Sequence, residues 1–175
     1  MKNKNDNNVS ESQIEDALTA NLFFLAKILK LPTELKLIAR QLRLKSGDER
    51  IDLLLTSGKR LCLVEIKVVP FSEAWLKQII SYRDELIRLQ NTGELISGEI
   101  LCFLLVTNAD NTEIELARQN GIIVNVYEPI NVLKEYFEKL AVVAPFLKIK
   151  PNDYGVFNLG LINRALIKLA DGIVR

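Results

Sequence analysis

The fold is decided by the stretch Arg50-Ile51-Asp52-Leu53-Leu54-Leu55-Thr56-Ser57-Gly58-Lys59-Arg60-Leu61-Cys62-Leu63-Val64-Glu65-Ile66-Lys67. Two apolar runs flank a polar break, with a glycine where a tight hairpin turn needs a positive φ. A turn centred on Gly58-Lys59 predicts that Asp52 lies directly opposite Glu65, with Cβ atoms about 4.5–5.5 Å apart. Because side chains alternate along a strand, Lys67 shares their face of the sheet.

Two interpretations of this acidic pair are open from the hairpin alone. Opposed carboxylates repel each other, and their neighbours are apolar, so a hard cation bound between them would relieve the conflict. Alternatively, Asp52 and Glu65 project from a solvent-facing strand, and Lys67 neutralises one of them. The residues that follow the hairpin bear on this choice.

A helix expected over residues 71–90 carries Gln78 and Tyr82. With the Asp and the Glu-x-Lys of the hairpin, this pattern resembles the PD-(D/E)XK nuclease superfamily over roughly residues 10–128. It looks closest to the nuclease domains of NucS-type and RecB-like enzymes. The proline that gives the family its name is absent, since Ile51 precedes the Asp; that position carries no chemistry.

The resemblance implies a role for each residue of the hairpin motif. Asp52, Glu65 and the backbone carbonyl of Ile66 would bind Mg²⁺ or Mn²⁺, and Lys67 would position or activate the attacking water. The family usually adds an acidic ligand from the first helix. Glu15 fits that position best, and Glu11, one turn earlier, is the competitor. Acids near a helix N-terminus also occur for dipole reasons alone, so both interpretations of Glu15 stay open.

Gln78 falls on the apolar stripe of its helix. A polar side chain that faces a sheet needs a partner, which predicts a contact with the carboxylates or the lysine of the hairpin and a catalytic role for Gln78. The alternative is a border residue that points to water. Trp75 and Tyr82 on the same stripe are expected in the core rather than as platforms for stacked bases.

The remaining elements predict an α/β fold: an antiparallel three-strand meander, continued by a βαβ unit, in a mixed sheet flanked by helices. This is the restriction-endonuclease-like fold that the resemblance implies. We expect a disordered tail (1–9), a nuclease domain (10–140) and a C-terminal extension (141–175) with a short helix near 161–170. The expected elements are a helix to about Lys30, a strand over 37–44, the hairpin, the Gln78 helix, a strand over 100–106, a helix to Gln119, a strand over 122–127 and a helix from about Pro129 to Leu140.

The composition of the chain indicates its domain size and excludes several catalytic mechanisms. The 175 residues are 49% hydrophobic with a net charge of +1, which fits one compact domain with short additional segments. The absence of histidine excludes Ser-His-Asp hydrolases, HNH-type nucleases and His-ligated zinc enzymes. Cys62 and Cys102 lie in separate apolar runs and are expected to be reduced core thiols. Six basic residues against one acid between 27 and 45 suit a phosphodiester ligand or, equally, a solvated face: Lys27, Lys30, Lys36, Arg40, Arg43 and Lys45.

The sequence thus predicts a cytoplasmic, divalent-metal-dependent deoxyribonuclease with Mg²⁺ or Mn²⁺ as cofactor and DNA as partner. No signal peptide or membrane span is expected. A homodimer, the DNA structure cleaved and the choice of DNA over RNA stay open. The alternative function is a catalytically inactive nucleic-acid-binding or partner-binding module on the same fold.

Overall fold

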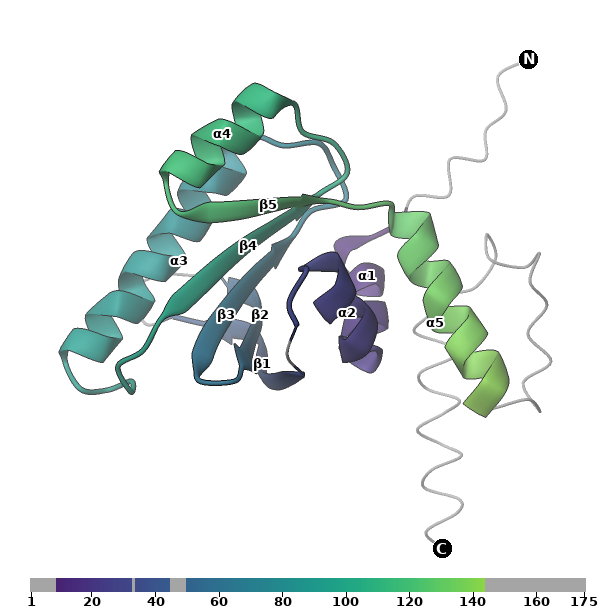
Figure 1. Ribbon diagram of the computed structural model, residues 1–175, viewed down its shortest axis with the longest axis horizontal. Coiled ribbons are helices and arrows are strands. Elements are labelled where there is room, and N and C mark those ends of the chain that lie inside the picture. The colour runs from purple at the N-terminus through teal and green to yellow at the C-terminus, as the bar shows by residue number, and fades with distance from the viewer. Residues whose placement is uncertain (1–8, 33, 45–49, 144–175) are drawn as a thin grey trace, which may run out of the picture. The chain divides into compact units, whose positions relative to one another are not determined.

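The computed structural model describes residues 9–32, 34–44 and 50–143 (Figure 1). The chain divides into two compact units, one formed by Asn21–Glu128 and the other by the segments before and after it. The expected N-terminal tail, except residue 9, and the expected helix near 161–170 lie outside the described residues. The domain limits expected from the sequence stay a prediction.

The Asn21–Glu128 unit is built on a five-stranded mixed sheet with the strand order β1-β2-β3-β4-β5. The first three strands are antiparallel, and β3, β4 and β5 are parallel to one another. The predicted meander and βαβ unit are therefore confirmed. The elements are α2 (Leu22–Ile28), β1 (Leu35–Arg43), β2 (Arg50–Ser57), β3 (Arg60–Ile66), α3 (Glu73–Asn91), β4 (Ile100–Val106), α4 (Asn111–Gln119) and β5 (Ile122–Val126).

The hairpin between β2 and β3 has the predicted register. Its ladder runs from Leu53 paired with Val64 to Ser57 paired with Arg60, and Gly58 has a φ of +62°. A left-handed residue at this position suits a tight turn because glycine has no Cβ to clash. The ladder between β1 and β2 is less regular, since its register shifts between Leu37 and Ala39.

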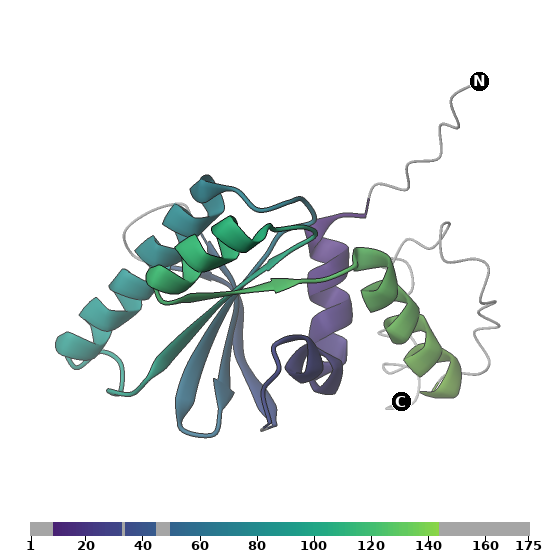
Figure 2. The same ribbon diagram turned by 45° about the horizontal axis from the view of Figure 1, so that its top comes forward.

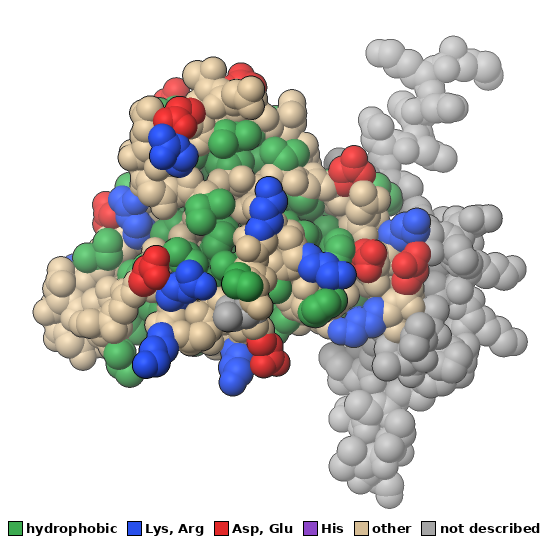
Figure 3. Space-filling view, in the orientation of Figure 1, with side chains coloured by type: hydrophobic (Ala, Val, Ile, Leu, Met, Phe, Trp, Pro, Cys, Tyr) green, Lys and Arg blue, Asp and Glu red, His purple; other side chains and the backbone are tan. Residues whose placement is uncertain are grey.

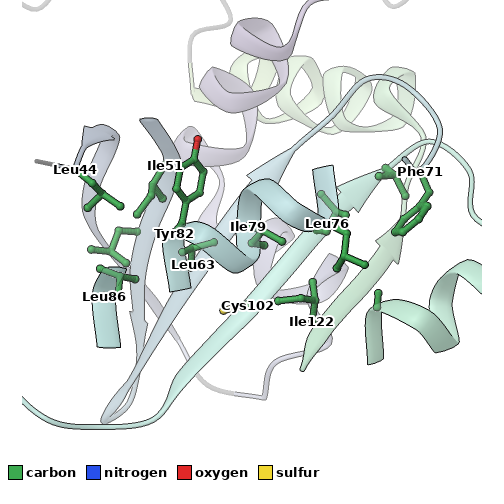
Figure 4. Packing of buried hydrophobic residues seen from close by; sticks show 14 residues of the cluster. Leu44, Ile51, Leu63, Phe71, Leu76, Ile79, Tyr82, Leu86, Cys102 and Ile122 are labelled. Carbon is green, nitrogen blue, oxygen red and sulfur yellow. The ribbon is translucent and has the colours of Figure 1, made fainter. Parts of the chain in front are cut away.

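Helices α3 and α4 cover the same face of the sheet (Figures 1 and 2). Ser72 caps the start of α3, where its side chain accepts a hydrogen bond from the Ala74 N–H. Tyr82 is buried in the core, as predicted, whereas Trp75 is partly buried at its border. Figure 4 shows α3 packed on the strands through this cluster, which includes Leu54, Leu63, Leu76, Ile79, Tyr82, Leu86, Cys102 and Leu104.

Helix α2 lies on the other face of the same sheet. Asn125 of β5 alternates with Val124, which packs against the α3 cluster, so Asn125 points to the opposite face. There its side-chain amide donates a hydrogen bond to the carbonyl of Ile28, the last residue of α2, at 2.9 Å. The sheet is thus covered on both faces, which accounts for the continuous apolar run of β4.

The other unit contains α1 (Glu11–Ala20) and α5 (Pro129–Val143). A capping box forms at the start of α1, where the Gln13 N–H and the Ser10 N–H each donate a hydrogen bond to the other residue's side chain. The prediction of one helix running to Lys30 is wrong, because Asn21 separates α1 from α2. The Asn21 side chain accepts a hydrogen bond from the Phe24 N–H and so starts a second helix.

Within the described ranges, no helix is both long enough and apolar enough to cross a bilayer.

Candidate functional site

The hairpin acids lie at the carboxyl end of β3. Glu65 pairs with Leu104 of β4, and Leu104 belongs to the cluster beneath α3. The Glu65 side chain therefore points under α3 instead of into solvent, and only 1% of the residue is exposed. Lys67, two residues later, is 6% exposed. Glu65 and Lys67 therefore do not project into solvent from the strand.

Three contacts tie the motif together. Asp52 Oδ2 accepts a hydrogen bond from the Ile66 N–H at 2.8 Å, which fixes β2 against the end of β3. Lys67 Nζ lies 2.8 Å from Glu65 Oε1. The Tyr127 hydroxyl donates to the Lys67 carbonyl at 3.1 Å, so the backbone after the motif is held from the end of β5. The structure brings Asp52, Glu65 and Lys67 into one site, as the register predicts.

The surroundings of Glu65 disfavour the ionised form of its carboxylate. Burial, and next the charge of Asp52, raise the pKa of Glu65 to about 7, although the Lys67 ammonium acts to lower it. Loss of hydration and a nearby like charge both disfavour the ionised carboxylate. One basic partner does not compensate for these two effects.

One oxygen of Glu65 has no partner in the described part of the chain. Oε1 contacts Lys67, but Oε2 is fully buried and accepts no hydrogen bond. A buried acceptor without a partner is costly and calls for a ligand. Among the residues described, no three Asp, Glu, Cys or His side chains form a metal-binding group. The described residues at this point are two carboxylates, Asp52 and Glu65, and such oxygen ligands suit a hard cation that keeps part of its water shell. A ligand role for the Ile66 carbonyl stays a prediction.

Trp75 contributes to the site through Lys67. The Lys67 ammonium lies 4.8 Å from the centroid of the Trp75 ring, within the range of a cation–π contact. With Glu65 Oε1, this contact holds the ammonium at a defined position at the end of β3. The sequence predicts Trp75 as a core residue and misses this contact, because the stripe of α3 does not show which residue lies over the strand end.

The predicted contact between Gln78 and the hairpin is not the contact observed. Gln78 Nε2 donates to the Tyr82 hydroxyl, one turn along α3, at 2.8 Å. Its Oε1 is buried and accepts no hydrogen bond from the described residues. The helix spacing of these two residues makes their contact available locally, so the hairpin is not needed as a partner. A catalytic role for Gln78 stays a prediction.

The two acids of the first helix lie in α1, in the other compact unit. Glu11 is the first residue of α1, and Glu15 is one turn further along. A ligand role for Glu15 or Glu11 stays a prediction.

Sequence reasoning missed Gln41. Its side-chain amide donates to Asp52 Oδ1 at 3.0 Å from the neighbouring strand β1. The sequence carries no local signal for this contact, since it depends on the register shift earlier in β1.

The basic residues expected between 27 and 45 do not form one stripe. One of them lies on α2, one just beyond its end and three on β1, and all five are exposed; Lys45 is outside the described residues. Figure 3 shows Lys and Arg side chains spaced among apolar and acidic ones on the visible face. The residues are Lys27 on α2, Lys30 beyond its end, and Lys36, Arg40 and Arg43 on β1.

The sheet order and the placement of the motif define the class of fold. An antiparallel meander followed by parallel strands, with Asp on the second strand and Glu-x-Lys at the end of the third, is the restriction-endonuclease-like arrangement. The sheet topology and the positions of Asp52, Glu65 and Lys67 are those expected from the sequence.

Comparisons with known proteins give the following. No protein-family model matches the chain, and neither does any curated protein. Among solved structures, a repair endonuclease from Pyrococcus abyssi is similar at 19% identity and a TM-score of 0.47, and EndoMS in a complex with double-stranded DNA at 17% and 0.48. SfsA from Pyrococcus furiosus with Ca²⁺ is similar at 14% and 0.37. Each match covers 65% of this chain but only 47%, 44% and 55% of the respective structures, about half their length.

Proposed function

We propose that this protein is a divalent-metal-dependent endonuclease that hydrolyses phosphodiester bonds in DNA. The observation that carries the proposal is the buried acceptor Glu65 Oε2, which has no hydrogen-bond partner among the described residues and belongs to an acid whose pKa Asp52 helps to raise. An arrangement of this kind destabilises the metal-free fold and is relieved by a cation. The presence of this unsatisfied acceptor at the end of β3 fits a binding site better than a structural ion pair.

The proposed ligands of the ion are Asp52, Glu65 and the Ile66 carbonyl. Mg²⁺ and Mn²⁺ both accept such oxygen ligands. When bound, the ion would polarise the scissile phosphate and lower the pKa of a coordinated water. Ionisation of Glu65 accompanies binding, because the charged carboxylate is the ligand.

Lys67 acts on the nucleophile in this proposal. Its ammonium is fixed by Glu65 Oε1 and by the Trp75 ring, so it needs little reorganisation when the substrate arrives. From that position it donates a hydrogen bond to the attacking water and offsets negative charge that develops on the phosphate. Its energetic effect is largest in the transition state.

Basic side chains on β1 and β2 support a polyanionic substrate. Lys36 and Arg43 lie on β1 and Arg50 lies on β2, and all three side chains are exposed. Contacts from such residues to phosphates give affinity that does not depend on base sequence.

A cytoplasmic location is part of the proposal. Both cysteines are buried free thiols, and burial raises the pKa of Cys62 to about 11 and that of Cys102 to about 12. Such thiols are unreactive core residues, which suits a reducing compartment.

The test is a cleavage assay on a panel of labelled nucleic acids. Single-stranded, duplex, flap, junction and mismatched DNA, with matched RNA strands, are incubated with the protein in Mg²⁺, in Mn²⁺ and in EDTA. Asp52→Asn and Glu65→Gln are the matched controls, since each keeps the shape of the side chain and removes one charge. The proposal predicts metal-dependent cleavage of a DNA substrate by the wild type and at least a roughly 100-fold loss in each variant.

Equal activity of the wild type and both variants would contradict the proposal. Retention on DNA without cleavage in either metal would instead favour the inactive nucleic-acid-binding module.

A further inference from the structure

Gln41 has a backbone conformation that is unusual for its position. It lies inside β1 with a φ of +48°, and the one other non-glycine residue with positive φ in the described ranges is Lys30, just beyond α2. A side chain with a Cβ is strained in the left-handed region. Strain of this kind persists where the surrounding structure requires it, and it clusters at functional sites.

The register shift in β1 selects Gln41 as the neighbour of Asp52. Up to Leu37, β1 pairs in a register that would place Arg40 opposite Asp52. The extra residue between Leu37 and Ala39 moves the pairing by one, so that Arg40 pairs with Leu53 and Gln41 faces Asp52. The bulge thus exchanges a cationic partner of Asp52 for a neutral one.

The contact between the two side chains completes the hold on the carboxylate. Gln41 Nε2 donates to Asp52 Oδ1 at 3.0 Å, while the Ile66 N–H donates to Oδ2 at 2.8 Å. Each oxygen of the carboxylate therefore accepts a hydrogen bond that restricts its direction.

The neutrality of Gln41 matters for a cation site. An arginine opposite Asp52 would form a bidentate ion pair and compensate the charge that attracts a metal ion. An amide orients the carboxylate by hydrogen bonding and adds no positive charge beside it. Partners of this type fix metal ligands in other proteins, where their removal costs roughly 10- to 100-fold in metal affinity.

We propose that Gln41 is a positioning residue, held by the bulge and its left-handed backbone so that its amide orients the Asp52 carboxylate toward a divalent cation. The inference rests on the proposed function, since it takes Asp52 as a metal ligand. It adds a residue of β1 to the site.

The experiment uses Gln41→Gly, which removes the amide and also relieves the backbone strain. Lys30→Gly is the matched control, because it relieves the same kind of strain at a position outside β1. Gln41→Arg keeps the donors and the reach but adds a charge. Each full-length variant is measured for its melting temperature, for Mn²⁺ affinity by calorimetry, and for amide hydrogen exchange without metal.

Gln41→Gly is expected to melt at or above the wild-type temperature while its Kd for Mn²⁺ rises roughly 10-fold. Its Ile66 N–H should exchange roughly 10-fold faster, because the carboxylate that accepts it is no longer fixed from β1. The Lys67 N–H, which donates to the Leu105 carbonyl at 2.9 Å, should be unchanged and reports on global opening. Gln41→Arg should lose Mn²⁺ affinity with normal Ile66 exchange, and Lys30→Gly should keep both at wild-type values.

A Gln41→Gly variant with wild-type Mn²⁺ affinity and wild-type Ile66 exchange would overturn the inference. Faster exchange at Ile66 and Lys67 alike would also overturn it, because that pattern shows general loosening. If the wild type binds no Mn²⁺ and cleaves no DNA, the proposed function fails; Ile66 exchange alone then decides whether Gln41 orders Asp52.

Discussion

Two glutamates of this protein form close ion pairs and yet respond in opposite ways. On the exposed surface of α4, Glu115 Oε1 lies 2.7 Å from an Arg118 guanidinium nitrogen, and the Arg118 hydrogen bond lowers the pKa of Glu115 to about 2. At the end of β3, Glu65 Oε1 lies 2.8 Å from Lys67 Nζ, and the pKa of Glu65 is raised to about 7.

The difference lies in the surroundings and not in the pairs. Water hydrates the Glu115 carboxylate, so a basic partner adds to an already favourable charge. Glu65 has lost its hydration and has a second acid beside it, and Lys67 does not offset both effects. An ion pair that fails to stabilise its own acid is a better marker of a site than an ion pair as such.

The largest effect is expected from Lys67→Ala. If Lys67 orients the nucleophile, this variant should lose roughly 100- to 1,000-fold in cleavage rate at saturating Mn²⁺, as is typical for loss of one donor that stabilises the transition state. Its Kd for Mn²⁺ should not increase, because a competing cation has been removed from Glu65. Lys59→Ala, in the hairpin turn, is the control and should cleave at the wild-type rate. Wild-type cleavage by Lys67→Ala would remove this residue from the mechanism.

Next in size is the contrast between Tyr82 and Gln78 on α3. Tyr82 is 2% exposed within the core cluster, so Tyr82→Ala should lower the free energy of unfolding by about 3 kcal/mol, measured by urea titration. Gln78→Ala should cost less than about 1 kcal/mol and should reduce cleavage if the amide serves the site. A Gln78→Ala variant with unchanged turnover would leave Gln78 as a structural partner of Tyr82.

The pH dependence of the free energy of unfolding tests whether the pKa of Glu65 is raised in the folded protein. Folded Glu65 holds its proton up to a pKa of about 7, whereas in the unfolded chain it releases it near its ordinary value of 4.5. The free energy of unfolding of the metal-free protein should therefore fall as the pH rises from about 4.5 to about 7, by at most about 3 kcal/mol. Chemical denaturation at several pH values should show this loss in the wild type and not in Glu65→Gln. If the free energy of unfolding changes with pH in the same way in the wild type and in Glu65→Gln, the pKa of Glu65 is not raised and the contrast with Glu115 fails.

The smallest effect is expected at Glu115. Because the pair with Arg118 is fully exposed, Glu115→Gln should leave the melting temperature at neutral pH almost unchanged, and the change should be smaller still at high salt, where the pair is screened. A large loss of stability would show that exposure does not separate the two glutamates.

The hairpin could be predicted from the sequence because its information is local. Gly58 fixes the turn, and alternation along two short strands then places Asp52, Glu65 and Lys67 on one face. The run of β4 was equally clear, since a strand covered on both faces is continuously apolar.

The features that were missed depend on context beyond a few residues. A helical apolar pattern continues through Asn21, so only the side-chain bond to Phe24 reveals the break between α1 and α2. No glycine near Leu37 predicts the bulge from the sequence, and Gln41 is not a residue type that favours a positive φ. The hydrogen bond from Gln41 to Asp52 depends on the bulge and on this backbone conformation. The sequence therefore does not predict Gln41 as a residue of the site.

The most direct test of the central claim, that Asp52 and Glu65 together bind a divalent cation, is the shift in melting temperature on adding Mn²⁺. At a tenfold excess over Kd, binding should stabilise the wild type by about 1.4 kcal/mol, a shift of several degrees. Glu65→Gln should melt at or above the wild-type temperature without metal, and both Asp52→Asn and Glu65→Gln should show little or no shift with metal. If both variants match the wild type with and without Mn²⁺, the two acids do not share an ion and the account is wrong.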